Sequence, residues 1–387
     1  VEFEATSNTN RIQIYGANLG FPATGVLDSV SIKEVTGDRA RLNYEIEGGL
    51  VNTKPSLLLE PQSTNLITYS EDYSQSDWVK SKSGSNSSIP IVTDNYAISP
   101  DGSTNASRVQ FDCGSTSSSD YVMINQNISL DGSSTYALSF YIKSNSSENQ
   151  SLLFFTQSSF GASITATSEW QRVETTLTSN TTNARGFGLV ARGSIQQEVD
   201  ILIYGGQLEQ QSYSTSLIPT NGSTQTRAAE TCNGAGTSSI FESSEGILYC
   251  EIAALTDLGS YRLISLSSSA SASNRVTIAY DVVNNQIYGQ CVASGTGQAL
   301  FTTQPTSISD FHKIALKYKA NDFAFWVDGV RIGTDTSGSI PTGLNSLSFD
   351  RADGAAYFYG KCRDIRVYNT KEMTDSEVDI LLTKITS

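Results

Sequence analysis

Apolar residues return along the whole chain in short runs that alternate with polar residues. In residues 136–143 (YALSFYIK), Tyr136, Leu138, Phe140 and Ile142 fall on one face of an extended strand. Residues 312–319 (HKIALKYK) alternate in the same way. Clusters of Ser, Asn and Gly, which favour turns, separate the runs. The pattern predicts an all-β fold of short antiparallel strands.

Eight such runs lie between residues 57 and 228, with turn residues between them. Eight short strands at this spacing are typical of a sandwich or jelly roll. The predicted strands are Leu57–Leu59, Arg108–Phe111, Tyr121–Ile128, Tyr136–Ile142, Leu152–Gln157, Gln171–Leu177, Gly186–Ala191 and Val199–Tyr204.

Residues 229–387 predict a second sandwich that ends in a helix. Two apolar arms flank Asp328-Gly329, a strong signal for a two-residue β-hairpin, and residues 364–368 form another strand. Residues 374–377 (TDSE) have the pattern of a helix-capping box. Apolar residues follow it at helical spacing, at Val378, Leu381, Leu382 and Ile385.

The first 35 residues contain only two strand-like runs, 11–15 and 26–35, which are too few to close a sandwich. A similar order of strand, polar loop and strand ending in Glu recurs at 186–209. We therefore expect residues 1–35 to be the C-terminal part of an upstream β-sandwich module and residues 36–56 to be a connection. No signal-peptide pattern or initial Met is present, which indicates a processed end or the start of a fragment.

Composition narrows the classes of partner. Only 17% of the residues are charged, while Tyr (18) and Phe (15) are plentiful, and the regular apolar runs argue against disorder. A net charge of −14 argues against binding to nucleic acid or to an anionic membrane surface. The sequence contains no run of 18 apolar residues, so it does not predict a membrane-spanning helix. The five cysteines are widely spaced, so we expect buried free thiols, with a Cys232–Cys250 bridge as the alternative.

Two parts of the chain resemble known families. Residues 57–73 (LLLEPQSTNLITYSEDY), 169–177 (EWQRVETTL) and 203–229 (IYGGQLEQQSYSTSLIPTNGSTQTRAA) resemble the carbohydrate-binding-module-like jelly roll of phage fibre and virion proteins. Residues 312–334 (HKIALKYKANDFAFWVDGVRIGT) and 362–382 (CRDIRVYNTKEMTDSEVDILL) resemble the concanavalin A-like lectin/glucanase fold in its laminin G-like form. We therefore expect a jelly roll over 57–228 and a laminin G-like sandwich over 229–387.

The resemblance also implies a function. It implies a bacteriophage structural protein of fibre or adhesin type on the virion surface, on the tail or a capsid appendage. Such a protein would bind host-surface polysaccharide non-covalently, contact other virion proteins and form a homotrimer. The alternatives are a capsid decoration or head-fibre protein with a purely structural role and, less favoured, a polysaccharide-degrading enzyme.

Catalysis has little support in the sequence. His312 is the only histidine, and its place at the start of a strand favours a structural role. Residues 198–202 (EVDIL) begin like the carboxylate strand of some lectin-like glucanases, but an apolar residue takes the place of the second Glu. The same pentapeptide recurs at 377–381 within the predicted helix, so we attribute it to chance. We expect no enzyme activity.

Aromatic side chains are the natural platforms for sugar rings. We interpret Trp170 and Trp326 as core residues. Trp78 follows a polar run and is the strongest single binding candidate. Three further candidates are aromatic residues that we place in loops: Tyr121, Tyr213 and Tyr261. Arg262 is adjacent to the last of these, and the dense aromatic run at 357–359 adds Tyr357 and Tyr359 to the predicted glycan-binding set. In the run 357–359 we expect Tyr357 and Tyr359 to share one face, with Phe358 packed inward.

We expect no organic cofactor and no catalytic metal. Modules related to the jelly roll often hold a structural calcium ion, and Glu71, Asp72 and Asp200 are the acidic residues that could serve one here. No EF-hand-like loop is present, so the favoured interpretation is that these carboxylates are solvated loop residues.

Overall fold

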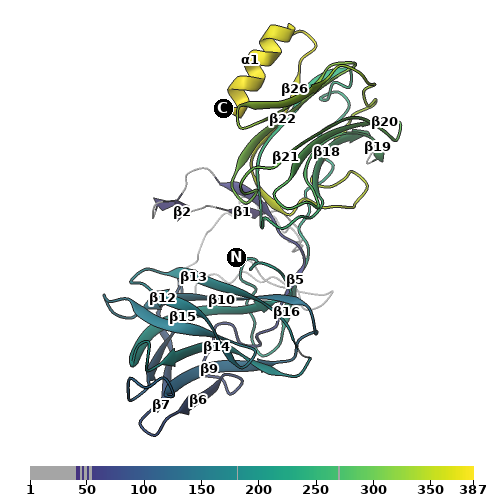
Figure 1. Ribbon diagram of the computed structural model, residues 1–387. Helices are drawn as coiled ribbons and strands as arrows, with labels where there is room; N and C mark the ends of the chain where they lie inside the picture. The colour runs from purple at the N-terminus through teal and green to yellow at the C-terminus, as the bar shows by residue number, and fades with distance from the viewer. Residues whose placement is uncertain (1–40, 44–45, 48–49, 52–54, 181, 269–270) are drawn as a thin grey trace, which may run out of the picture. The chain divides into compact units, whose positions relative to one another are not determined.

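The computed structural model describes residues 41–43, 46–47, 50–51, 55–180, 182–268 and 271–387, and these residues form an all-β protein with one short helix. The strands form two antiparallel sandwiches, and Figure 1 labels most of them. The predicted upstream module at 1–35 lies outside the described residues. Within the described part, no helix has the length and apolar character needed to cross a bilayer.

The first sandwich is the predicted jelly roll, made of two five-stranded sheets with the orders β13-β10-β15-β8-β7 and β12-β11-β14-β9-β6. A two-stranded ribbon, β16-β5, adjoins them. The strands are β5 (Ser63–Asn65), β6 (Val79–Ser83), β7 (Ser88–Ile98), β8 (Thr104–Asp112), β9 (Tyr121–Ile128), β10 (Thr135–Ser144), β11 (Gln150–Thr156), β12 (Ser159–Ala166), β13 (Gln171–Thr178), β14 (Arg185–Arg192), β15 (Glu198–Glu209) and β16 (Gln225–Arg227).

Alternation along these strands builds the jelly-roll core. Tyr136, Leu138, Phe140 and Ile142 of β10 are at most 1% exposed and lie in one cluster between the two sheets. The predicted face of this strand is therefore confirmed. Strands β6, β7 and β12 were not predicted, because they are edge strands whose residues are largely polar or exposed.

The second sandwich pairs a seven-stranded sheet, β1-β4-β26-β17-β22-β23-β24, with a five-stranded sheet, β21-β20-β19-β18-β25. Strands β2 (Ile46–Glu47) and β3 (Leu50–Val51) form a separate ribbon. The other strands are β1 (Arg41–Asn43), β4 (Ser56–Leu59), β17 (Glu245–Ala254), β18 (Arg262–Ser268), β19 (Ser271–Tyr280), β20 (Ile287–Ala293), β21 (Thr296–Thr303), β22 (His312–Lys319), β23 (Phe323–Val327), β24 (Val330–Asp335), β25 (Ser346–Ser348) and β26 (Gly360–Asn369).

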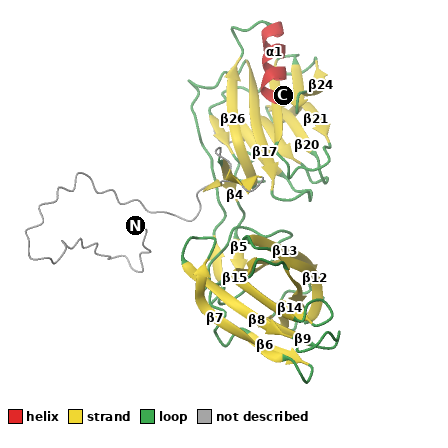
Figure 2. Ribbon diagram, turned by 90° about the vertical axis from the view of Figure 1, so that its left-hand side faces the viewer, coloured by secondary structure: helices red, strands yellow, loops and turns green. Residues whose placement is uncertain are grey.

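The predicted helix is confirmed as α1 (Asp375–Thr386), and it covers the outer face of the seven-stranded sheet (Figure 2). Thr374 and Glu377 form the predicted capping box. Val378 and Leu382 pack on Trp326, so this tryptophan is a core residue, as favoured. The Asp328-Gly329 hairpin is also confirmed, with φ values of 48° and 78° at the two turn residues.

Strand β4 corrects one expectation. Leu57–Leu59 was predicted to be a jelly-roll strand, but it pairs with Cys362–Gly360 of β26 and joins the sheet of the second sandwich. Strand β1 pairs with β4 in turn, so part of the segment expected to be only a connection is a strand. Alternation in a run of three residues cannot reveal its partner, because pairing between distant strands is decided by tertiary structure.

The jelly roll is consequently inserted into the second sandwich. The chain leaves the seven-stranded sheet after β4, forms the jelly roll and returns before β17. The two ends of the insert lie side by side, because the amide of Glu230 donates to the carbonyl of Glu60 at 3.0 Å. The amide of Glu60 in turn donates to the Glu230 carboxylate at 2.7 Å.

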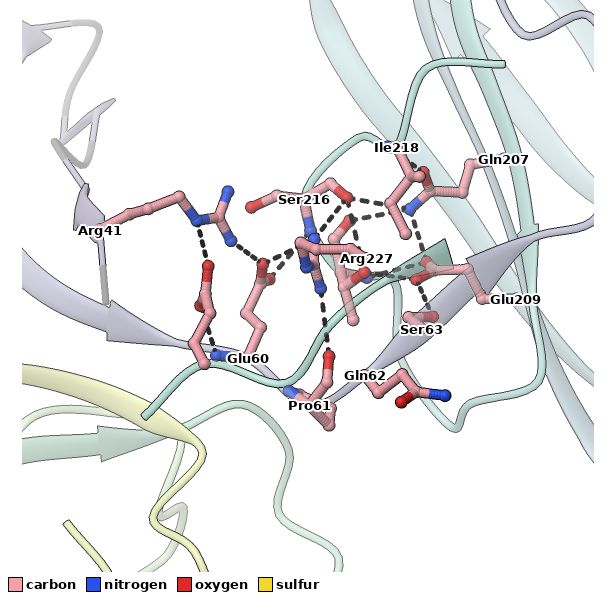
Figure 3. A network of polar contacts seen from close by, with 12 residues as sticks. Arg41, Glu60, Pro61, Gln62, Ser63, Gln207, Glu209, Ser216, Ile218 and Arg227 are labelled. Carbon is pink, nitrogen blue, oxygen red and sulfur yellow. Dashed lines mark hydrogen bonds and ion pairs between the residues drawn. The ribbon is translucent and has the colours of Figure 1, made fainter. Parts of the chain in front are cut away.

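A network of polar side chains surrounds the two chain segments that connect the sandwiches, near Glu60 and Glu230 (Figure 3). Glu60 and Glu230 are at most 4% exposed, and the guanidinium of Arg41 bridges their carboxylates. Arg227 pairs with Glu60 at 3.0 Å and donates to the carbonyl of Ser216 at 3.1 Å. The partners compensate the cost of burying these charges.

Glu209 extends the network into the jelly roll. Its carboxylate accepts hydrogen bonds from the hydroxyl of Ser63 at 2.6 Å, the amide of Thr215 at 2.9 Å and the side chain of Gln207 at 2.6 Å. The long segment 205–229 on which the jelly-roll resemblance rests therefore builds the junction.

All five cysteines are free thiols, and four of them are buried. The alternative of a Cys232–Cys250 bridge is therefore wrong. Burial also raises the pKa of Cys291 and Cys250, which keeps these thiols protonated and unreactive.

Candidate functional site

The outer face of the jelly-roll sheet β12-β11-β14-β9-β6 carries an apolar cluster that is separate from the core between the two sheets. Leu153 and Phe155 of β11 and Val190 of β14 are buried there, with Tyr121 and Met123 of β9 packed against them. The alternate residues of the same strands point into the sandwich core. Leu153, Phe155 and Val190 are at most 7% exposed, so the surface of this cluster is formed by the residues that cover them.

Two aromatic contacts shape this cluster. The rings of Tyr121 and Phe160 meet edge to face with centroids 5.2 Å apart, and Phe155 lies 6.5 Å from Phe160. Phe160 is 41% exposed, so much of its ring is free. The guanidinium of Arg192 lies 4.4 Å from the centre of the Phe160 ring, which holds that ring in place.

Amide and hydroxyl groups border the aromatic rings. Asn125 and Asn127 follow Tyr121 and Met123 along the outer face of β9, and Ser81 lies on the neighbouring β6. Ser158 and Ser159 come from the turn between β11 and β12. With Val79, these aromatic, apolar and polar residues line a groove of about 730 Å³, which we call the aromatic groove.

Two glycines lie on this outer face of the sheet, on the strand between β9 and β11. On β14, Gly186 and Gly188 face Asn127 and Asn125 across the ladder. A Cβ atom at Gly186 would lie 2.6 Å from the ring of Phe155 and 2.8 Å from the side-chain nitrogen of Asn125. Glycine therefore allows the aromatic ring and the amide to approach each other.

The turn at Gln157-Ser158 has a backbone that is unusual for its residues. Both residues have positive φ values, 50° and 62°, in a two-residue hairpin turn that normally favours Asn and Gly. The turn is held by two hydrogen bonds between Ser158 and Gly186, at 3.1 and 3.2 Å. Backbone strain of this kind is concentrated at functional sites, and here it places Ser158, Ser159 and Phe160 at the groove.

The groove is suited to binding and not to acid–base chemistry. Its lining contains no Asp, Glu, His, Lys or Arg. Aromatic and apolar faces surrounded by amides and hydroxyls can pack on a ligand with apolar faces and hydrogen-bond to its polar rim.

Among the predicted binding residues, Tyr121 lies in the groove, at the start of β9 and not in a loop. Trp78, the strongest candidate, is only 1% exposed, so this prediction is wrong. Its ring packs on Tyr73 and Phe140 with centroids 4.7 and 6.3 Å away, and its indole nitrogen donates to the carbonyl of Tyr69. Trp170 is half-buried and donates to the carbonyl of Ile98 at 3.1 Å.

Arg262 is also structural. It is 6% exposed, donates to the carbonyls of Thr256 and Leu258 at 3.3 and 2.7 Å, and has its pKa lowered by burial. Burial raises the pKa of Tyr213 to about 12, although the charge of Arg262 opposes this effect. Arg262 was therefore wrongly assigned to a glycan site, because its hydrogen-bonding groups are already used within the protein.

The remaining predicted aromatics lie in the second sandwich, away from the groove lining. Tyr357 and Tyr359 stack with ring centroids 6.0 Å apart, and Phe358 is fully buried, as predicted for this run. Tyr261 is 51% exposed.

Two of the three carboxylates considered as calcium ligands have partners within the protein. Asp200 forms a two-pronged ion pair with Arg108, at 2.9 and 2.6 Å. Glu71 accepts a hydrogen bond from the hydroxyl of Tyr204 at 2.7 Å. Among the described residues no group of three or more His, Cys, Asp or Glu side chains is placed to hold a metal ion.

The sequence analysis missed Phe155, Phe160, Asn125 and Asn127. A usable signal was present in residues 121–127 (YVMINQN), where alternation places Tyr121, Met123, Asn125 and Asn127 on one face of a strand. Phe155 and Phe160 gave no comparable signal, because only the hairpin geometry brings them beside β9.

No family model and no curated protein matches the sequence. Solved structures similar to this chain include carbohydrate-binding modules and a pentraxin. One is the CBM40 of the Ruminococcus gnavus IT-sialidase, bound to α2,3-sialyllactose, which is 13% identical with a TM-score of 0.32. The match covers 40% of this chain and 94% of the CBM40 chain. A heptameric SAP-like pentraxin from Limulus polyphemus is 9% identical (TM-score 0.31; 40% and 74% covered), and a CBM4 structure is 15% identical (0.23; 32% and 87%). At these identities and TM-scores the likeness says nothing about the ligand of this chain.

Proposed function

We propose that this chain binds glycan non-covalently and that the aromatic groove is the binding site. The observation that carries the proposal is the exposed ring of Phe160, which packs on Tyr121 and Phe155 at a groove bordered by Asn125 and Asn127. Sugar rings have C–H faces that pack on aromatic rings and hydroxyls that pair with amides. The groove offers both kinds of contact side by side.

We further propose the biological setting that the sequence resemblance implies. The chain would act as a fibre or adhesin protein on a virion surface, as a homotrimer, with host-surface polysaccharide as its ligand. A trimer is expected to have about three times the 41.6 kDa chain mass in light-scattering chromatography, and a monomeric mass would contradict this part of the proposal.

A glycan-array screen of wild type and Phe160→Ala tests the binding proposal. Because Phe160 is 41% exposed, its truncation should leave the fold intact. We expect binding to at least one glycan to weaken tenfold or more, about 1.4 kcal/mol. Tyr261→Ala is the matched control, since this 51% exposed aromatic lies outside the groove and should leave binding unchanged. Equal binding by wild type and Phe160→Ala would refute the site.

A purely structural role is the second candidate, and one feature favours it. The edge strand β7 exposes Ile89, Ile91 and Ile98 by 54–63%, which is typical of a surface that packs on another subunit. If this surface is a subunit contact, Ile91→Asp should dissociate the oligomer. If the oligomer survives the change, β7 is not its interface.

We do not propose catalysis. A polysaccharide hydrolase needs two carboxyl groups across the scissile bond, and the groove lining has none. We expect no release of reducing ends from any glycan that the protein binds. Release that continues in the purified chain would contradict this expectation.

A further inference from the structure

The chemistry of the aromatic groove also limits the kind of glycan it can take, provided that the groove is the binding site. None of its lining residues carries a charge at neutral pH. An acidic sugar brings a carboxylate, and burying a carboxylate without a cation or strong donors is costly. The groove therefore has no compensation for an anionic ligand.

A cation beside the groove, Arg192, is partly engaged within the protein. The guanidinium of Arg192 lies against the ring of Phe160, and one of its nitrogens donates to the carbonyl of Ser118 at 2.6 Å. On β6, Val79 and Ser81 line the groove. Lys80 and Lys82 alternate with them and pair with the inward-facing residues of β9, so they belong to the opposite face of the strand. The lysines donate to the carbonyls of Ser74 and Ser87.

The extent of the groove bears on the length of the ligand. Its lining reaches from Val79 on β6, one edge of the sheet, to Phe160 on β12, the other edge. Four strand spacings of about 4.8 Å make the sheet roughly 19 Å wide at its backbone. Above the sheet, the rings of Tyr121 and Phe160 meet with centroids 5.2 Å apart. Both ends are open, because Val79 and Phe160 are 40% and 41% exposed. Gly186 and Gly188 place no side chain across the middle.

We infer that the groove binds an internal segment of an uncharged polysaccharide, several sugar units long, and rejects sialylated or uronic acid chains. An open trough across the sheet does not require a chain end. Amides and serine hydroxyls both donate and accept hydrogen bonds, so they match neutral hydroxyl groups. The protein's net charge of −14 adds repulsion against a polyanion.

Affinity electrophoresis of the full chain tests this inference. The neutral probes are dextran, mannan, galactomannan and mixed-linkage β-glucan, and the acidic probes are polysialic acid, alginate and hyaluronan. We expect retardation by at least one neutral polymer and by no acidic one. Phe160→Ala should weaken that retardation at least tenfold, and Tyr261→Ala should not. Oligomers of the bound polymer should bind at least tenfold more tightly than its monosaccharide.

The outcomes separate this inference from the proposed function. Retardation by an acidic polymer that Phe160→Ala abolishes would overturn the inference and leave the groove as a glycan site. Equal affinity for the monosaccharide and the long oligomer would overturn the internal-segment part alone. If none of the seven polymers retards the chain, both the inference and the proposed function fail.

Discussion

His312 shows how a single residue can be read from its hydrogen bonds. Its Nδ1 lies 2.6 Å from a carboxylate oxygen of Asp328, and its Nε2 lies 2.7 Å from the carbonyl oxygen of Ser307. Both partners are acceptors, so both contacts are hydrogen bonds only when the ring is protonated to an imidazolium. Burial alone would lower the pKa of His312, but these hydrogen bonds and the charge of Asp328 outweigh it and raise the pKa above 6.5.

The raised pKa predicts a pH dependence of stability. A group whose pKa rises on folding contributes stability that is fully present below its unfolded pKa, near 6.5, and is lost as the pH rises through its folded pKa. We therefore expect the free-energy difference between wild type and His312→Gln to be largest below pH 6 and to shrink as the pH rises. Urea unfolding between pH 5.5 and 8.5 measures it, and a difference that is constant over this range would contradict the imidazolium assignment.

Single residues were the level at which sequence reasoning was weakest. Trp78 follows a polar run, yet it is buried because Tyr73 and Phe140 close around it, the second from 62 positions away. Arg262 stands beside an exposed tyrosine, yet loop carbonyls capture its guanidinium. The exposure of a side chain depends on such partners from distant parts of the chain, and the residues next to it in the sequence do not reveal them.

Elements with local signals were predicted well. The capping box at Thr374, the Asp328-Gly329 turn and the alternation in 136–143 each involve residues close together in the sequence. Edge strands such as β7 and the pairing of β4 with β26 were missed. An edge strand buries little, and pairing between strands far apart in the sequence leaves no periodic pattern.

The helix cap supports a prediction at this scale. The hydroxyl of Thr374 accepts from the amide of Glu377 at 3.4 Å, and the Glu377 carboxylate accepts from the amide of Thr374 at 2.8 Å. We expect Thr374→Ala to lower the free energy of unfolding by about 1 kcal/mol. Ser376→Ala, an exposed change one residue before Glu377, should alter it by less than about 0.5 kcal/mol. Equal effects of the two changes in urea unfolding would show that the cap contributes nothing.

At the scale of the whole molecule, the inserted jelly roll has a direct consequence. Strand β4 supplies Leu59 to the core of the second sandwich and covers the edge of β26. We expect residues 229–387 alone to lack cooperative unfolding. Residues 41–60 joined by a short Gly/Ser linker to 230–387 should fold, because Glu60 and Glu230 are directly hydrogen-bonded. Calorimetry of both fragments measures this, and a cooperative transition in 229–387 alone would refute the insertion.

The central claim is that ligand binding belongs to one outer face of the jelly roll. Amide hydrogen exchange on the full chain, with and without a glycan selected by the array screen, measures where binding protects the backbone. The account predicts added protection in Tyr121–Ile128 and at the hairpin turn of residues 156–160, with none in the second sandwich. Protection around Tyr261 or Tyr357, with the aromatic groove unchanged, would contradict it.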